Sequence, residues 1–313
     1  MKNSLWHRYE FVAYLAILAG VVGHSTSEFV SVLTHIEGPE LSVWRFLLGG
    51  IGLIILSLLF PNSRNLIEPF QKEGLRLVWL SALGITIGYL FFHMALDYAT
   101  VPQVATMITT VPIFVGFISS RKAKKPFPRT KLITGYCAMI GVALLITEGT
   151  LAALFESSQN LIGILMTLVC AAALAFFTVF IRPMIDEFGA LRITTITMNI
   201  GGVGLWLVVG LYWSIWVNPL TLLDRPPQEW GYLLTLAIGN TTITQFLWLG
   251  GLAAVSDITR GSYLFFFKPV IAAVLAVVFL NQSVTPFEIA AIAVICISVL
   301  FEASQAFKQT KAT

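Results

Sequence analysis

Five ionisable side chains lie inside long apolar segments of this chain, and they are the first candidates for chemistry. They are His24, Glu28, Arg45, His93 and Lys268. Placing a charged group at the centre of a bilayer costs roughly 2.5–3.5 kcal/mol on insertion scales, so such groups normally face a cavity or a partner. A buried lysine could hold the carboxylate or phosphate of a solute, and a glutamate beside a histidine could exchange protons.

Lys268 is the strongest candidate for a binding residue. It lies near the middle of the apolar segment 259–280 and directly precedes Pro269, which should free the carbonyl of Phe265 one turn earlier. A cation beside unwound backbone at the membrane midplane suits a carboxylate or a phosphate. The structural alternative is an ion pair with Glu28 that only holds helices together. We favour the binding role, because a buried pair adds little stability compared with apolar residues.

Glu28 and the two histidines form a second group of candidates. His24 and Glu28 are four residues apart and therefore share one helix face, which suits proton coupling. The alternative, left open by the sequence, is a structural ion pair between Glu28 and Arg45 near the outer surface. His93 is a candidate for substrate contact, with a hydrogen bond to a neighbouring helix as the alternative.

A polar run in the second half of the chain predicts a wall of the same site. It consists of Asn240, Thr241, Thr242, Thr244 and Gln245. Gln245 and Trp248 are three residues apart on one helix face, and a hydrogen-bonding wall with an aromatic plate suits amphipathic solutes. Together with Tyr263, these side chains are predicted to shape a cavity. The alternative is ordinary interhelical packing of small polar residues in a membrane bundle.

The composition places these side chains in a membrane protein. Hydrophobic residues make up 57% of the chain and charged residues only 11%, whereas a soluble domain carries roughly 25% charge. The stretches 157–181, 193–223 and 230–256 contain no Asp, Glu, Lys or Arg, and each is long enough to cross a hydrocarbon core about 30 Å thick. We predict an all-α membrane protein with ten transmembrane helices, at 11–33, 40–60, 76–97, 102–120, 131–148, 159–182, 191–213, 230–253, 259–280 and 286–306.

The chain also contains the same pattern twice. Gly49-Gly50-Ile51-Gly52 recurs as Gly201-Gly202-Val203-Gly204, and Pro112 has a counterpart in Pro269. Because five helices per half is an odd number, the second half must enter the membrane from the opposite side. The pattern therefore predicts two inverted repeats, residues 1–150 and 151–313, as in proteins that open alternately to two sides of a bilayer. The matched prolines are candidate hinges, with static kinks as the alternative.

The positive charges predict the orientation. Of the 19 Lys and Arg residues, all except Arg45, Lys268 and Arg225 lie on the side of the N-terminus. By the positive-inside rule both termini should be cytoplasmic, in the cell membrane. This anchoring explains the pI near 8.8, so no nucleic-acid partner is expected.

Several kinds of chemistry find no support in the sequence. There is no phosphate-binding loop for ATP, no zinc helix and no nucleophile elbow. The cysteines Cys137, Cys170 and Cys296 all fall inside predicted spans and are expected to be small core residues. We therefore expect no cofactor and no metal, and any movement of a solute should be passive or driven by a gradient.

The ordered motifs resemble the drug/metabolite transporter superfamily, specifically its ten-helix EamA-type transporters. The matching features are Arg45-Phe46, Ala95-Leu96 with Tyr98-Ala99 before a helix containing Pro112, and Arg260-Gly261-Ser262 before Pro269. The resemblance covers essentially the whole chain. It implies a central cavity surrounded by helices one, three, four, six, eight and nine, and secondary transport, often export, of amino acids, other metabolites or drugs.

The same resemblance guides the reading of individual residues. In smaller relatives a glutamate of the first helix couples proton and drug, and Glu28 lies in that helix but nearer its outer end. Many relatives carry a glutamate just after the ninth helix, where this chain has Asn281-Gln282. Lys268 adds a positive charge where many relatives are apolar, which favours an anionic or zwitterionic substrate over a lipophilic cation.

We therefore expect a secondary transporter of small organic metabolites, such as amino acids or organic anions, and not an enzyme. Its partners would be the solute, the lipid bilayer and a coupling ion such as H⁺, with the protein a monomer or homodimer. A membrane-embedded enzyme using His93, His24 and Glu28 on a lipid-like substrate is the alternative from another class. A receptor without transport activity is disfavoured, because the connecting loops are short.

Overall fold

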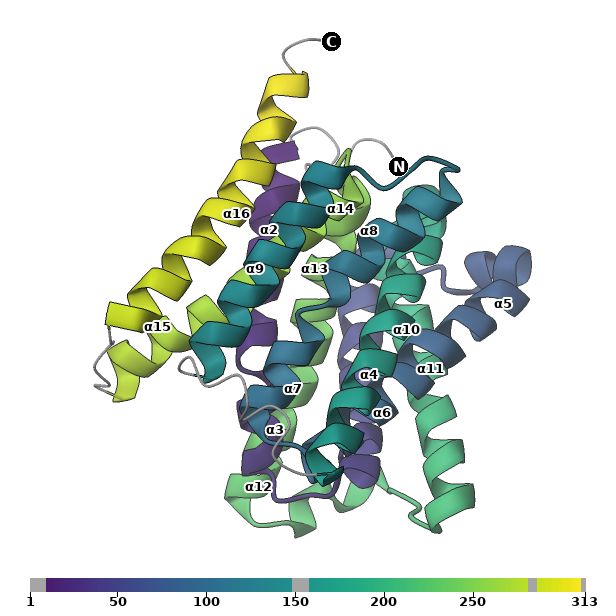
Figure 1. Cartoon of the computed structure of the whole chain (residues 1–313). Helices are drawn as coiled ribbons and strands as arrows, with labels where there is room; N and C mark the ends of the chain where they lie inside the picture. The colour runs from purple at the N-terminus through teal and green to yellow at the C-terminus, as the bar shows by residue number, and fades with distance from the viewer. Residues whose placement is uncertain (1–9, 148–157, 281–285, 311–313) are drawn as a thin grey trace.

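The structure is a computed structural model that describes residues 10–147, 158–280 and 286–310, and these residues are helical with no strand among them (Figure 1). The first half contains α2 (Glu10–Ser25), α3 (Ser27–Leu33), α4 (Gly38–Leu59), η1 (Pro61–Ser63), α5 (Ile67–Ser81), η2 (Ala82–Ile87), α6 (Gly88–Tyr98), α7 (Val101–Ile108), α8 (Val111–Lys122) and α9 (Arg129–Thr147). The second contains α10 (Ser158–Phe188), α11 (Ala190–Trp213), η4 (Pro219–Asp224), α12 (Pro227–Leu234), η5 (Thr235–Ile243), α13 (Thr244–Ala254), α14 (Ile258–Tyr263), η6 (Leu264–Phe267), α15 (Lys268–Leu280) and α16 (Pro286–Thr310). The predicted repeat boundary at 150/151 and Asn281-Gln282 lie outside the described residues.

The bundle belongs to a multi-pass membrane protein. Seven helices are long and apolar enough to cross a bilayer, at Glu10–Leu33, Gly38–Leu59, Ile67–Tyr98, Gln103–Lys122, Asn160–Phe188, Ala190–Trp213 and Ile258–Leu275. The other predicted spans, at 131–148, 230–253 and 286–306, are also helical where described but do not reach that threshold of length and hydropathy. Their role as crossings therefore remains a prediction.

Two of the long helices contain a π-helical stretch. In the first half η2 separates α5 from α6, and in the second half η5 separates α12 from α13. A π turn replaces the i→i+4 bonds of the α-helix by i→i+5 bonds, and such turns are rare and frequently mark functional sites. Both stretches coincide with small polar residues, including Thr86 in η2 and the run beginning at Asn240 in η5.

The glycine-rich faces explain where the two π stretches pack. The hydroxyl of Thr242 in η5 donates to the carbonyl of Gly49 in α4, at 2.9 Å. The hydroxyl of Thr86 in η2 donates to the carbonyl of Gly201 in α11, at 3.0 Å. The absence of a Cβ atom lets the backbones approach closely enough for these bonds. The glycine-rich segment 49–52 of α4 thus contacts η5, and the matching segment 201–204 of α11 contacts η2.

Pro112 and Pro269 each lie at the start of a helix and not within one. Pro112 follows a break at Thr109 and Thr110 and occupies the first turn of α8, where a missing N–H costs nothing. Pro269 is the second residue of α15, after the 3₁₀ turn η6. The carbonyl of Phe265 accepts the N–H of Lys268 in this turn, so it is not free for a ligand as the sequence had suggested.

The two broken helices also begin with side-chain caps. Thr100 and Gln103 form a capping box at the start of α7, and Asp257 accepts the N–H groups of Thr259 and Arg260 at the start of α14. Asp257 also pairs with Lys131 of α9. Burial raises the pKa of Asp257, but the hydrogen bonds and charges of Lys131 and Arg260 together outweigh that effect and hold it below its ordinary value.

The described ends of the chain lie together. In Figure 1 α2 begins and α16 ends at the same, upper end of the bundle, beside the ends of α8 and α14. Helices α9, α15 and α16 gather on one side, where α9 and α16 share a second, smaller apolar cluster with Tyr263 of α14 and Phe266 of η6. The larger core lies between the remaining helices and surrounds the candidate site.

Candidate functional site

A small cavity lies in the middle of the larger core. Its polar lining residues are His24, Ser27, Arg45, Tyr89, Thr178, Gln245 and Lys268, and its aromatic lining residues include Phe92, Phe177, Trp248 and Phe265. They come from the helices that the family resemblance implied, together with Arg45 from α4. The volume of about 40 Å³ admits a few water molecules, so a larger solute requires the surrounding helices to move apart.

Lys268, which lines this cavity, forms a buried ion pair with Glu28. The Lys268 ammonium donates to Glu28 Oε1, and the two side chains are only 5% and 4% exposed. Among the residues that the structure describes, no ion pair joins Glu28 to Arg45, which corrects the pairing considered from the sequence. The reason is that the Arg45 side chain extends toward η5, while Lys268 of α15 faces the carboxylate.

Arg45 is fully buried and every group that it bonds is neutral. Its Nε donates to Thr241 Oγ1 at 3.0 Å, and its Nη2 donates to the carbonyl of Asn240 at 3.2 Å, both within the π stretch η5. Its Nη1 donates to Ser27 Oγ at 2.8 Å and contacts His93 Nε2 at 3.3 Å. These four contacts fix the guanidinium beside the cavity without neutralising its charge.

The contacts of His93 determine which ring nitrogen carries its proton. Arg45 has only donors, so His93 Nε2 must accept, and His93 Nδ1–H must donate to Ser42 Oγ at 2.8 Å. The Ser42 hydroxyl in turn donates to the carbonyl of Gly38 at 2.8 Å. A histidine that activates a serine must accept the serine proton. This arrangement has the opposite polarity, and it therefore gives the enzyme hypothesis no support.

His93 also lies at the boundary of a second pocket. This outer pocket, of about 230 Å³, lies where α3 ends, α4 begins and α6 ends, and its lining includes His93, Asp97, Glu37 and His35. The carboxylate of Asp97 accepts the N–H of Gly38 at 3.1 and 3.0 Å, at the start of α4. His93 bonds Arg45 of the central cavity on one side and lines the outer pocket on the other, so it separates the two spaces.

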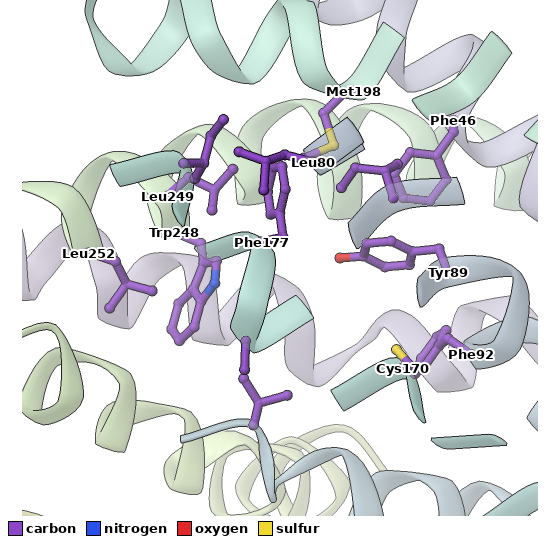
Figure 2. Close-up of a cluster of buried hydrophobic side chains, with 14 of the residues drawn as sticks. Phe46, Leu80, Tyr89, Phe92, Cys170, Phe177, Met198, Trp248, Leu249 and Leu252 are labelled. Carbon is purple, nitrogen blue, oxygen red and sulfur yellow. The ribbon is translucent and has the colours of Figure 1, made fainter. Parts of the chain in front are cut away.

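An aromatic cluster forms the other wall of the cavity. The ring of His24 makes edge contacts with Trp248 at 5.7 Å and with Phe265 at 5.5 Å, measured between centroids. Its Nε2 is buried without a hydrogen-bond partner among the described atoms. Figure 2 shows the phenol of Tyr89 pointing toward Phe177 and the Trp248 indole. The cavity thus has charged groups and flat apolar surfaces in contact with the same space.

The remaining predicted site residues lie in different surroundings. Gln245 lines the cavity and donates to the hydroxyl of Tyr89. Asn240 does not line it; its amide donates to the carbonyl of Gly23 and to Thr26 Oγ1. Tyr263 is also elsewhere, because it belongs to the second, smaller apolar cluster and its hydroxyl donates to the carbonyl of Lys131 in α9.

Sequence reasoning missed two kinds of site residue. Tyr89, Phe92 and Phe177 line the cavity but look like ordinary apolar residues of a membrane helix. Asp97 lines the outer pocket, yet its position at the end of a predicted span resembles that of a boundary residue. In the sequence, the signal for Tyr89 was its position four residues before His93, which places both side chains on one helix face.

Comparison with known proteins identifies the family. The chain is 26% identical over 250 residues to an uncharacterized transporter of Archaeoglobus fulgidus, covering 80% of this chain and 82% of the relative. It is 24% identical to the uncharacterized transporter YyaM of Bacillus subtilis, covering 75% and 74%. A crystal structure at 16% identity matches the fold with a TM-score of 0.75, covering 95% and 98%. Since residues 11–147 and 161–302 both match its pattern, the chain belongs to the EamA-like transporter family.

Proposed function

We propose that this membrane transporter moves small organic metabolites, such as amino acids or organic anions, across the cytoplasmic membrane by alternating access. It would act as a secondary active exporter or exchanger. The observation that carries this proposal is the central cavity, which buried Arg45 and Lys268 line beside aromatic walls, with Glu28 buried against Lys268. Buried ionisable groups inside a membrane bundle mark solute or ion pathways far more often than they stabilise the fold.

We also propose that the chain consists of ten transmembrane helices in two inverted repeats. The reciprocal hydrogen bonds support this, because Thr86 bonds Gly201 while Thr242 bonds Gly49. A twofold relation between halves requires contacts to occur in such pairs. The separate family matches to 11–147 and 161–302 agree with two similar halves. The described chain ends, at one end of the bundle, agree with an even number of crossings.

The matched irregular segments support a mechanism of opening. The α-helical backbone is interrupted just before Pro112 and just before Pro269. The helices on either side of these breaks reach the central cavity, because α7, α8 and α15 each contribute a lining residue. Helix breaks of this kind are where a small number of backbone angles can absorb a large movement. We propose these two breaks as hinges that open opposite sides of the cavity.

Within the site we assign three kinds of role. Gln245, Trp248 and Lys268 would contact the solute directly because they line the cavity. His93 and Asn240 would act through Arg45, which both of them contact. Glu28 and His24 are the candidates for proton coupling, while Tyr263 would stabilise the start of the broken helix α14–α15 through its bond to Lys131.

The test is counterflow in sealed proteoliposomes. Vesicles are loaded with a mixed pool of amino acids, organic acids and aromatic amines, and exchange is followed by mass spectrometry. Selective exchange of one class, lost when the vesicles are made permeable, is the expected result. Chemical conversion of a pool member by protein in detergent would instead favour an enzyme. No exchange of any class by folded protein would refute the proposed function for these solutes.

A further inference from the structure

Among the described residues, the two charged side chains that line the central cavity and the carboxylate bonded to one of them carry one more positive than negative charge. Lys268 and Glu28 neutralise one another, whereas Arg45 has no carboxylate partner among the described residues and is fully buried. A lysine or a histidine could lose its proton to escape this cost, but a guanidinium stays charged under all physiological conditions. A buried charge without a counter-charge is strongly unfavourable, so the site lacks one negative charge.

We infer that the solute is an organic monoanion with an aromatic or other apolar body, and that Arg45 binds its anionic group. This inference rests on the proposed transport function and narrows its substrate class. Binding a monoanion would bring the charge of the cavity to zero. The flat side chains of Phe92, Phe177, Trp248 and Phe265 would then cover the apolar body of the solute.

The hydrogen bonds of Arg45 leave room for such a partner. A guanidinium has five N–H groups, and the contacts to Thr241, Ser27, His93 and Asn240 use one each. One N–H of Nη2 is therefore left without an acceptor among the described residues. Because Arg45 lines the cavity, an anionic oxygen there could accept this bond and add charge neutralisation to it.

Other charge classes fit the cavity less well. A cation would add to the positive charge of Arg45. A zwitterion would bring a carboxylate and an ammonium, but none of the described residues that line the cavity has a carboxylate, and Glu28 beside it is already bonded to Lys268. For the same reason Lys268 is a poorer anchor than Arg45, because releasing Lys268 to a solute would leave Glu28 buried without its partner.

Two series of solutes with a constant body and a varied charge test the inference. The first consists of phenylacetate, phenylalanine and phenylethylamine, and the second of indole-3-acetate, tryptophan and tryptamine, which are an anion, a zwitterion and a cation at pH 7. Thermal unfolding in detergent reports binding without a sealed membrane, because a ligand that binds only the folded protein raises Tm. We expect the two carboxylates to raise Tm at concentrations at least tenfold lower than the other four compounds.

Charge-removing variants assign the preference to one residue. Arg45→Gln should reduce the apparent affinity for both carboxylates at least tenfold. Arg45→Lys, which keeps the charge, should retain the preference and provides the same test if the glutamine variant does not fold. The double variant Glu28→Gln/Lys268→Met should keep the order of preference, because Arg45 is intact. Arg64→Gln removes an exposed arginine far from any buried charge and is the matched control.

The outcomes separate this inference from the proposed function. Counterflow confined to amino acids or amines would refute the monoanion while leaving transport established. Carboxylate binding that survives Arg45→Gln but is lost in Glu28→Gln/Lys268→Met would make Lys268 the anchor and refute the role of Arg45. Carboxylate exchange that depends on Arg45 would support both. Absence of exchange for every class would refute the proposed function for these solutes, and the inference with it.

Discussion

The buried ion pair between Lys268 and Glu28 makes a quantitative prediction about stability. Both side chains are about 5% exposed or less, so water screens their interaction very little. We consider three variants: Lys268→Met, Glu28→Gln and the combination of the two. Each single change leaves one buried charge without its partner, whereas the double change removes both charges and leaves side chains of similar volume.

The expected magnitudes follow from this difference. Breaking a buried pair by removing one partner costs about 3–5 kcal/mol, whereas replacing both partners by less polar groups is often neutral or stabilising. Glu28→Gln should lie at the upper end, because it leaves the positive charges of Lys268 and Arg45 without any anion nearby. Lys268→Met should lie at the lower end, because Glu28 still attracts Arg45. The double variant should lie within about 1 kcal/mol of the wild type.

The assay is equilibrium unfolding of the purified protein in mixed micelles, followed by tryptophan fluorescence as the denaturing detergent is increased. The control is Lys72→Met, because Lys72 is 57% exposed and lies 3.1 Å from Glu68, which keeps its second partner, Arg192, in this variant. This change should affect stability far less than either buried variant, as surface pairs generally do.

The result that would refute this reasoning is additivity. If the double variant loses as much stability as the two single variants together, the two charges are not coupled and the pair contributes nothing as a pair. Single variants at Lys268 and Glu28 that cost no more than the surface control would show that water reaches both groups. In that case water would also be expected to reach Arg45, and its charge would need no anionic partner.

Three further predictions concern packing, pH and orientation. Gly204→Ala places a Cβ closer than 3.0 Å to the hydroxyl of Thr86 in η2 and should cost about 1–3 kcal/mol of unfolding free energy. The control is Gly231→Ala, whose Cβ meets nothing within 4 Å. Equal losses of stability in the two variants would contradict the close packing at Gly204. Because the pKa of Asp257 is below its ordinary value of 3.8 in the folded protein, its ionised form adds stability above pH 3.8, and this stability is lost as the pH falls through the folded pKa. Asp257→Asn should lack this acid-dependent loss of stability. A variant with the same dependence of unfolding free energy on pH as the wild type would contradict the ion pair. A membrane-impermeant maleimide should label Leu220→Cys from outside intact cells and Lys124→Cys only after permeabilisation, and the reverse pattern would overturn the orientation.

The class of the protein could be predicted from the sequence because it depends on local properties. Hydropathy over about 20 residues indicates a membrane helix wherever that segment is placed. The cost of burying a charge is also local, so Lys268, Glu28, Arg45, His24 and His93 could be recognised as unusual without any structure, and all five are buried. The order of weak motifs along the chain was sufficient to indicate the family, which the comparisons confirm.

The pairing of these side chains could not be predicted in the same way. Glu28 and Lys268 are 240 residues apart, and Arg45 and Thr241 are 196 apart. Helical periodicity determines which residues share a face, but it carries no information about which face meets which neighbour. Both Arg45 and Lys268 were possible partners for Glu28, and only the fold, which brings Glu28 of α3 against Lys268 of α15, selects Lys268.

The sequence by itself therefore determined that this is a helical membrane protein of a transporter family with several charges buried inside it. The tertiary structure decided that Lys268 neutralises Glu28, that Arg45 has no counter-charge bonded to it within the described part of the chain, and that Tyr263 and Asn240 do not line the cavity. The physical reason is the range of the forces involved. Burial is governed by the composition of one segment, whereas charge balance in a cavity is the sum over helices that only the fold brings together.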